Sequence, residues 1–260
     1  VFQESLLQVP KLIAQRTDAV FRFVPHHAAH AWYAMGTSPF ERAAVLVVDG
    51  VGEGASLSLG TATRHSVLIE EQSFFPASVG LAWEKGALSM GLTEYDACKV
   101  MALAGLNSGG SQDPFEQVMA YREDGLWLDQ NVLGIEFPDD FSGLSRRFGT
   151  RDSGVVDSTA NRRLAAGIQR ATEQLLLVAI AHLAEKYGER HLVYGGGVAL
   201  NCRANSILAA SEIMDRVHVG PAAHDAGTAV GAAWGVDAAL SNQDVPHQDP
   251  RLIAYSGPSM

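Results

Sequence analysis

Two histidines four residues apart are the first residues in the sequence whose spacing suggests chemistry. His26 and His30 lie in the segment HHAAHAWYAM, which has the composition of a helix and ends at Gly36. Side chains at positions i and i+4 of a helix face the same side, so both imidazoles can bind one metal ion. The spacing alone equally allows one histidine to pack and the other to be solvated. His27 lies about 100° further round the helix and is not expected at the same site.

Two aspartates stand beside glycine-rich turns and can complete such a metal site. Asp49 follows the apolar run 43–48, and Gly50 and Gly52 just after it open the backbone and are candidates for cofactor binding. A carboxylate at the C-terminal end of a strand is a favoured ligand-binding position in α/β proteins, although Asp-Gly is also a common hairpin turn. Asp225 opens the segment DAGTAVG, where it can also cap a helix. Mixed nitrogen and oxygen donors suit Fe(II), Mn(II) or Zn(II).

A triple glycine follows an expected strand and precedes an expected helix. Without side chains, Gly195, Gly196 and Gly197 let backbone N–H groups approach phosphate oxygens, and a helix N-terminus favours the negative charge. Asn201 follows one helical turn later and can bond a ribose hydroxyl. Gly227, in the turn that begins with the second aspartate, permits close approach of a ligand or of another helix. Each turn therefore has a structural interpretation beside the nucleotide-binding one.

The hydrophobic pattern predicts the elements that must bring these residues together. Strands are predicted at residues 21–24, 43–48, 56–59, 66–70, 191–194 and 216–219. The second to fourth of these are joined by tight turns and form an antiparallel meander. Apolar residues at three- and four-residue spacing then predict a long helix over 157–187. The last two strands are each followed by a helix, which implies parallel pairing with helices on the sheet faces.

This order of elements predicts an α/β fold, the ribonuclease-H-like lobe of the actin, sugar-kinase and Hsp70 ATP-binding superfamily, with a helical and irregular insertion. We expect one lobe over residues 1–260. Its parts are a metal-binding helix and β-meander (21–73), an insertion or lid (74–156), a helix–strand nucleotide-binding half (157–240) and a tail (241–260).

Composition excludes several classes of protein. The chain has 260 residues, of which 47% are hydrophobic and 18% charged, so it is not intrinsically disordered. Two cysteines, Cys98 and Cys202, are too few for a disulfide-stapled module and fit a reducing compartment. A net charge of −10 repels phosphate backbones, and no apolar run approaches the roughly 20 residues of a membrane span. No signal-peptide pattern is visible, so we expect a cytoplasmic protein with neither a nucleic-acid nor a membrane partner.

Several ordered motifs resemble the antibiotic and nodulation O-carbamoyltransferases, from about Phe21 to the C-terminus. The motifs are HHAAHA from His26, SPF from Ser38, AAVL from Ala43, DGVGE from Asp49, EYDA from Glu94, KVMALA from Lys99, GGGVALN from Gly195, PAAHDAG from Pro221 and YSGP from Tyr255. Two positions depart from the family pattern, since Cys98 and Ala102 stand where that family usually has glycine.

The resemblance implies a relative of the tRNA threonylcarbamoyl-transfer enzymes, with an iron ion bound by His26, His30, Asp49 and Asp225. It also implies that the triple glycine and the Asp-Ala-Gly turn surround an adenylate. The donor would then be carbamoyl-adenylate, made from carbamoyl phosphate and ATP. A hydroxyl of a small secondary metabolite would attack its carbonyl, and AMP would leave. The metal would polarise the carbamoyl oxygen, while backbone amides would hold the leaving phosphate.

The general base is not identified by any motif, and His27, Glu53 and Lys99 are the candidates. Members of the family begin with another ribonuclease-H-like lobe and carry a separate domain that makes carbamoyl-adenylate. Neither is found in these 260 residues, so we expect a partner lobe or subunit. Two alternatives stay open: a threonylcarbamoyl-type tRNA modifier, which the acidic charge disfavours, and a non-catalytic nucleotide-binding partner subunit.

Overall fold

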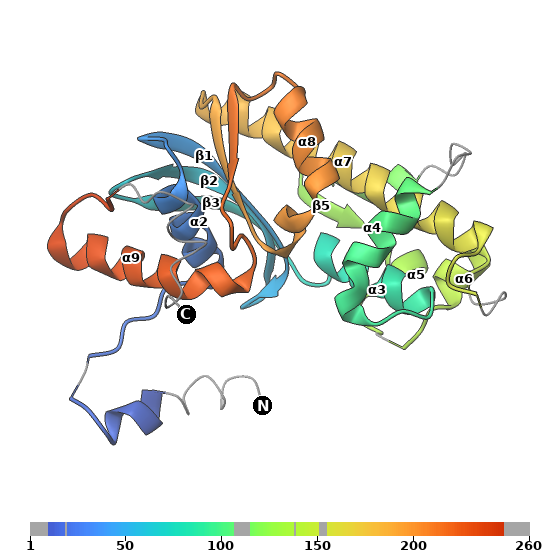
Figure 1. Ribbon diagram of the computed structural model, residues 1–260, viewed down its shortest axis with the longest axis horizontal. Helices are drawn as coiled ribbons and strands as arrows, with labels where there is room; N and C mark the ends of the chain where they lie inside the picture. Colours follow the sequence, from blue (N-terminus) through green and yellow to red (C-terminus); the bar gives the residue numbers. More distant parts are fainter. Residues whose placement is uncertain (1–9, 19, 107–114, 138, 151–154, 247–260) are drawn as a thin grey trace, which may run out of the picture.

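A five-stranded mixed sheet forms the centre of the molecule (Figure 1). The computed structural model describes residues 10–18, 20–106, 115–137, 139–150 and 155–246. The strands are β1 (Arg42–Gly52), β2 (Ala55–Thr63), β3 (Val67–Phe74), β6 (His191–Gly195) and β7 (Arg216–Val219), in the order β3-β2-β1-β6-β7. The first three pair antiparallel, whereas β6 pairs parallel with both β1 and β7. The predicted meander and the predicted parallel strand–helix units are therefore confirmed.

The strand predicted at residues 21–24 is wrong. That segment is assigned to no strand, and Phe23 is 71% exposed. It runs directly into Pro25, the N-cap of α2 (His26–Thr37), so its apolar residues lead the chain into a helix and do not join the sheet. An apolar run of four residues has too little periodicity to separate these two outcomes.

Strand β1 is buried on both faces because helices cover the sheet on both sides (Figure 1). Val45 and Val47 share a cluster with residues of α2, while Leu46 and Val48 share one with residues of α7 (Thr159–Tyr187). Successive side chains of a strand point to opposite faces, so a nearly continuous apolar run is needed at this position. The sheet face that carries α2 also has α9 (Thr228–Ser241) packed on that helix.

Helix α7 begins and ends within two residues of where the sequence predicts. The Ser158 side chain accepts a hydrogen bond from the Asn161 N–H and caps the first turn. Gly188 follows the last turn with φ of 66°, a left-handed conformation that glycine adopts without a Cβ penalty. The predicted helix over 157–187 is therefore confirmed, with its first residue two positions later than predicted. In the described part of the chain, neither this helix nor any other has the length and hydropathy to cross a membrane.

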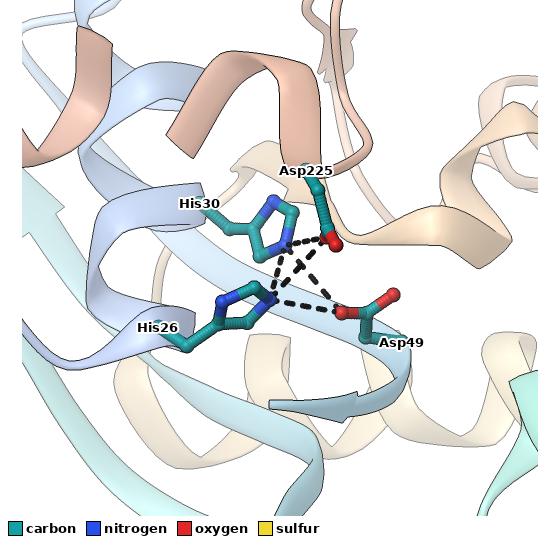
Figure 2. Close-up of side chains that lie close together, drawn as sticks. All are labelled: His26, His30, Asp49 and Asp225. Carbon is teal, nitrogen blue, oxygen red and sulfur yellow. Dashed lines mark hydrogen bonds and ion pairs between the residues drawn. The ribbon is translucent and has the colours of Figure 1, made fainter. Parts of the chain in front are cut away.

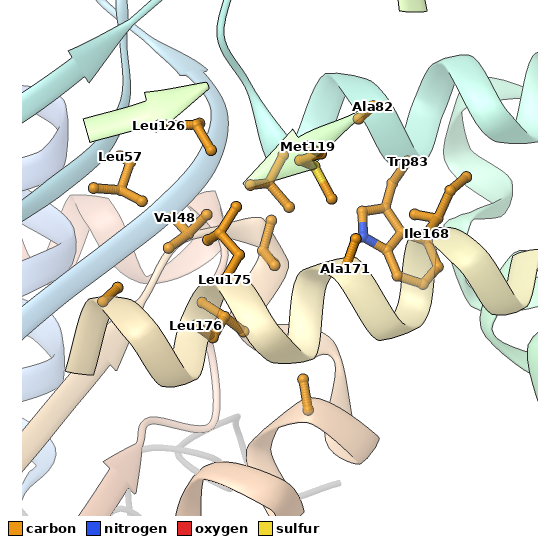
Figure 3. Packing of buried hydrophobic residues seen from close by; sticks show 14 of the residues in the cluster. Val48, Leu57, Ala82, Trp83, Met119, Leu126, Ile168, Ala171, Leu175 and Leu176 are labelled. Carbon is orange, nitrogen blue, oxygen red and sulfur yellow. The ribbon is translucent and has the colours of Figure 1, made fainter. Parts of the chain in front are cut away.

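The described residues between β3 and α7 form short helices and a hairpin. The elements are α3 (Val79–Ser89), η1 (Glu94–Asp96), α4 (Ala97–Gly105), η2 (Phe115–Gln117), β4 (Met119–Arg122), β5 (Gly125–Leu128), α5 (Gln130–Leu133) and α6 (Ser142–Phe148). Trp83 and Met119 pack with Ile168 and Leu175 of α7 in the main hydrophobic cluster (Figure 3). The Trp83 indole N–H also donates to Thr172 Oγ1 at 3.0 Å. The segment thus shares one core with α7.

Close helix packing sets the position of α9 on α2. A Cβ on Gly231 would lie 1.9 Å from the Ala29 carbonyl oxygen, and one on Gly235 would lie 2.7 Å from the Trp32 Nε1 atom. Glycine at these two positions therefore permits the close approach of α9 to the α2 backbone at Ala29 and to the Trp32 ring. The helix after α7, α8 (Cys202–Ala210), packs against α7 on the opposite side of the sheet.

Glu71 joins the edge strand β3 to the end of α7. Its carboxylate accepts hydrogen bonds from Lys186 Nζ at 2.9 Å, His182 Nε2 at 3.0 Å and the Tyr187 hydroxyl at 3.1 Å. Burial raises the pKa of Glu71, but the hydrogen bonds from Lys186 and His182 outweigh it and hold that pKa below its ordinary value. The contacts therefore stabilise the ionised carboxylate.

We expect Glu71→Gln to lower the free energy of unfolding by about 1 kcal/mol at neutral pH. The folded-state pKa lies below the unfolded one, so the stabilisation is complete above the unfolded-state value and is lost as pH falls through the folded-state value. Urea denaturation of both proteins between pH 7 and pH 3 measures the difference. A difference that stays constant over this range would contradict the assignment.

Candidate metal centre

Four side chains from three separate parts of the chain point at one spot (Figure 2). His26 and His30 lie on one face of α2, Asp49 lies in β1, and Asp225 begins the short helix η4 (Asp225–Gly227) before α9. One donor atom from each lies within 4.8 Å of all the others. The two Nε2 atoms are 3.1 Å apart, and each lies 3.4 Å from Asp225 Oδ1. Asp49 Oδ2 is 3.1 Å from the His26 Nε2 atom and 3.5 Å from that of His30.

The end of β1 positions the Asp49 carboxylate. The register with β2 shifts between Val48 and Gly52, so the strand leaves its regular ladder where Asp49 stands. One carboxylate oxygen, Oδ2, faces the imidazoles, while the other, Oδ1, accepts a hydrogen bond from the Gly197 N–H at 2.9 Å. Because β1 and β6 are parallel neighbours, their C-terminal ends meet and bring the triple glycine to this aspartate.

The electrostatics of the four side chains favour a cation. The hydrogen bond to Asp49 raises the pKa of His26 above its ordinary value, although burial opposes it. Burial also raises the pKa of Asp49, but hydrogen bonds from both histidines and from Gly197 outweigh it and hold that pKa well below its usual range. Asp49 is therefore ionised at neutral pH. Two carboxylates beside two imidazoles form a negative site whose donor types suit a divalent first-row metal.

The triple glycine is needed for close packing within the protein, whether or not it also binds a ligand. A Cβ on Gly196 would lie 2.2 Å from the Val48 carbonyl oxygen, and this residue has φ of 94°. A Cβ on Gly195 would lie 3.3 Å from His30 Cβ, so the turn also packs against α2. Gly227 lies against Tyr33, because a Cβ there would come within 2.7 Å of its ring. The use of these turns by a nucleotide stays a prediction.

Asn201 is already paired inside the protein. It is 8% exposed and caps α8, since its Oδ1 accepts from the Ala204 N–H at 3.1 Å. Its Nδ2 donates to Gln169 Oε1 at 3.0 Å, and Gln169 Nε2 donates back to its Oδ1 at 3.2 Å. One Nδ2 hydrogen is left for a ligand, because the amide carries two donors.

Two residues that hold Asp49 were not among the site residues predicted from the sequence. Ser78, the N-cap of α3, donates from its hydroxyl to the carbonyl oxygens of Asp49 at 3.2 Å and of Gly50 at 2.6 Å. Gly80 brings α3 onto the same backbone, because a Cβ there would lie 2.7 Å from the Gly50 nitrogen. A glycine in the first turns of a helix is disfavoured by propensity, and that was the available signal.

We expect Gly80→Ala to push the Asp49 backbone away from the imidazoles. The added Cβ meets backbone atoms, which cannot rotate aside, so we expect metal binding about tenfold weaker and stability about 2 kcal/mol lower. Isothermal titration with Fe(II) or Zn(II) and urea denaturation measure the two effects. Gly105→Ala is the matched control, because a Cβ at that helical position meets nothing within 4 Å. Equal behaviour of both variants would contradict the prediction.

A cavity of about 470 Å³ opens beside Asp49. Trp83 and Met101 form apolar walls, and Glu84 and Glu94 add carboxylates. Burial raises the pKa of Glu84, and the nearby Glu94 and Asp49 carboxylates raise it further. The triple-glycine turn also borders this cavity through Gly197, as does Asn201. In the described part of the chain, no lysine or arginine lines it.

The three candidate general bases lie in different places. His27 is buried, its Nδ1 hydrogen-bonds Ser58 Oγ at 2.7 Å, and burial lowers its pKa to about 4. Glu53 Oε2 accepts a hydrogen bond from the His26 backbone N–H at 3.3 Å. Both line a second cavity, of about 490 Å³, on the side of His26. Lys99 lines neither cavity, and its Nζ pairs with Asp96 at 2.7 Å on the surface of α4.

Residues 4–234 match the model of the family described as "Carbamoyltransferase N-terminus". The match covers most of the chain, so the chain belongs to the carbamoyltransferase family. It is 33% identical over 246 residues to Nodulation protein NolNO of Sinorhizobium fredii, covering 92% of this chain and 34% of that protein. It is 34% identical over 252 residues to the uncharacterised protein sll1178 of Synechocystis, covering 91% of this chain and 40% of that protein.

Two solved structures share the fold. HypF of T. kodakarensis aligns with a TM-score of 0.56 and 14% identity, over 91% of this chain and 39% of that chain. Full-length HypF in a phosphate- and nucleotide-bound form aligns with a TM-score of 0.53 and 13% identity, over 90% and 45%. The chain thus spans between a third and a half of the length of these relatives and structural neighbours.

Proposed function

We propose that this chain is the metal- and nucleotide-binding lobe of an O-carbamoyltransferase. The reaction would move a carbamoyl group from carbamoyl-adenylate, formed from carbamoyl phosphate and ATP, to a hydroxyl of a small secondary metabolite. The observation that carries the proposal is the meeting of two imidazoles and two carboxylates at the end of β1, in a chain of the carbamoyltransferase family. The strand order β3-β2-β1-β6-β7, with helices on both faces, supports a ribonuclease-H-like lobe.

The four donor atoms fit a first-row divalent ion such as Fe(II). Metal–ligand bonds of roughly 2.0–2.2 Å place neighbouring donor atoms about 3.0–3.6 Å apart in octahedral or tetrahedral coordination. The two histidine Nε2 atoms lie 3.1 Å apart, and each lies 3.1–3.5 Å from a carboxylate oxygen of Asp49 and of Asp225. When bound, such an ion supplies a Lewis acid that polarises a carbonyl or phosphoryl oxygen.

The protein's own contribution is to hold these donors in place. Gly197 fixes one oxygen of Asp49, so the other stays aimed at the imidazoles. His30 is fully buried, whereas the Asp225 side chain is 72% exposed. The site is therefore closed by protein at His30 and open at Asp225, while the His26 side chain is 23% exposed at the edge of the second cavity. The partner lobe that we expect would approach from the Asp225 side.

The cavity beside Asp49 supports nucleotide binding. Trp83 and Met101 can pack against a base, and Glu84 and Glu94 can accept hydrogen bonds from ribose hydroxyls. No lysine or arginine is among its described lining residues, so phosphate charge would be met by the metal and by the backbone amides of the glycine turn. HypF, a structural neighbour, has been solved in a phosphate- and nucleotide-bound form.

Metal analysis and a transfer assay test the proposal. The full-length protein, or this chain with its partner lobe, is purified and its metal content measured by mass spectrometry. It is then given ATP, carbamoyl phosphate and a panel of hydroxyl acceptors, and AMP release is followed. One first-row metal per chain and acceptor-dependent AMP release support the function. Nucleotide binding without transfer in the complete assembly would instead support a non-catalytic subunit.

A further inference from the structure

The second cavity, of about 490 Å³, lies at the first turn of α2 and shares one side chain, His26, with the candidate metal centre. It is bounded by that turn, by the β1–β2 turn at Glu53 and by the edge strand β3. The cavity beside Asp49 borders the candidate metal centre at Asp49 itself. Two separate cavities thus reach the candidate metal centre, one at the histidine and one at the aspartate.

The walls of the second cavity are mainly aromatic and apolar. Phe23, Trp32 and Phe74 line it, together with Val67 and Ile69 of β3. Phe23 is 71% exposed and Phe74 is 57% exposed, so these rings leave much of their surface without protein contact. Flat aromatic faces stack well on other rings, including the apolar face of a sugar. The wall chemistry favours a compound with a ring that can lie against these aromatic faces.

Polar groups accompany these aromatic walls, and two of them, His27 and Ser58, are buried. Gln72 Nε2 donates to Ser58 Oγ at 3.0 Å, and the same oxygen hydrogen-bonds His27 Nδ1 at 2.7 Å. The other ring nitrogen, His27 Nε2, has no hydrogen-bond partner among the described residues, although His27 is only 2% exposed. An unsatisfied buried polar atom is costly, and a ligand hydroxyl, which can both donate and accept, would satisfy it.

We propose that this cavity binds the carbamoyl acceptor, a hydroxylated ring compound whose ring lies against the aromatic walls. The inference rests on the proposed function, because a transfer reaction needs separate places for donor and acceptor around one reacting carbonyl. Glu53 and His27 supply polar groups for the acceptor's hydroxyls at the His26 end of the cavity. An aromatic alcohol and a pyranose share this chemistry, and the experiment separates them.

The test measures binding of two probes to the chain without metal or donor. The probes are 2-naphthylmethanol and methyl β-D-glucopyranoside, titrated by saturation-transfer NMR. We expect one of them to bind, and its Kd to rise at least tenfold in Phe74→Ala and in Phe23→Ala. Phe137→Ala is the matched control, because Phe137 is 65% exposed and does not line the cavity. Circular dichroism of each variant identifies any loss of folding, and having two wall variants keeps the test decisive.

The outcomes separate this inference from the proposed function. The acceptor site is overturned if neither probe binds, or if the wall variants and Phe137→Ala lose probe affinity equally. Either outcome leaves the metal and transfer results untouched. Binding to this chain that disappears in the full-length protein also overturns it, because another segment then fills the cavity. Probe binding with no metal and no transfer would overturn the proposed function while the cavity remains a ring-binding site.

Discussion

Replacing His30 with alanine should abolish stoichiometric metal binding and, with it, carbamoyl transfer. His30 has a fully buried side chain, and its Nε2 lies 3.4–3.5 Å from the Asp225 and Asp49 oxygens. Alanine removes one of four donors, and water fills this closed side poorly. We expect metal affinity to fall roughly 1,000-fold, which corresponds to about 4 kcal/mol. Isothermal titration calorimetry with Fe(II) under anaerobic conditions, or with Zn(II), measures the affinity.

A matched histidine elsewhere on the protein controls for this substitution. His65 is 48% exposed and lies outside the candidate metal centre, near Asp244. His65→Ala should bind metal as the wild type does. Metal should also raise the Tm of wild type and of His65→Ala but not of His30→Ala, because a ligand stabilises only the state that binds it. Wild-type affinity in His30→Ala would remove the metal centre from the proposal.

Gly231→Ala should cost about 3 kcal/mol of stability. The added Cβ would lie 1.9 Å from the Ala29 carbonyl oxygen, so α9 has to move away from α2. Alanine is the better helix former by up to about 1 kcal/mol, but backbone contact at this distance outweighs that gain. Asp225 lies in η4, directly before α9, and His26 lies on α2, so the same movement also separates two candidate metal ligands.

Two measurements together test the helix contact. Urea denaturation of the metal-free protein gives the loss of stability, and calorimetry gives a lower metal affinity. Gly105→Ala again serves as the control, since its Cβ meets nothing within 4 Å, and it should be neutral or slightly stabilising. Gly231→Ala with wild-type stability would show that α9 packs differently on α2.

Most helices and strands could be predicted because their signals are local. The apolar run of β1, the three- and four-residue spacing of apolar residues in α7 and the strand–helix repeat after residue 190 all act within a few residues of chain. The segment 21–24 was the exception, because a short apolar run carries no period. Candidate ligands were also found from local signals, namely residue type, spacing and position beside a glycine turn.

The role of each glycine and of the Asn201 side chain could not be predicted from the sequence, because it depends on contacts between distant segments. The pairing of β1 with β6 brings Gly197 to Asp49, and Gly80 matters only because α3 packs on the end of β1. Asn201 is paired with Gln169 of α7, a partner that no spacing rule identifies. Both cavities likewise arise from packing of separate elements.

The sequence by itself determined the α/β class, the order of the elements and the candidate ligands His26, His30, Asp49 and Asp225, since propensity, periodicity and motif are properties of short stretches of chain. The tertiary structure alone decided that the four meet within 4.8 Å, that one cavity borders the aspartate and another the histidine, and that α9 lies on α2 through glycine. The physical reason is that hydrogen-bond register and close packing join residues far apart in the chain, 199 positions for His26 and Asp225 and 202 for Ala29 and Gly231. No local pattern encodes such distances.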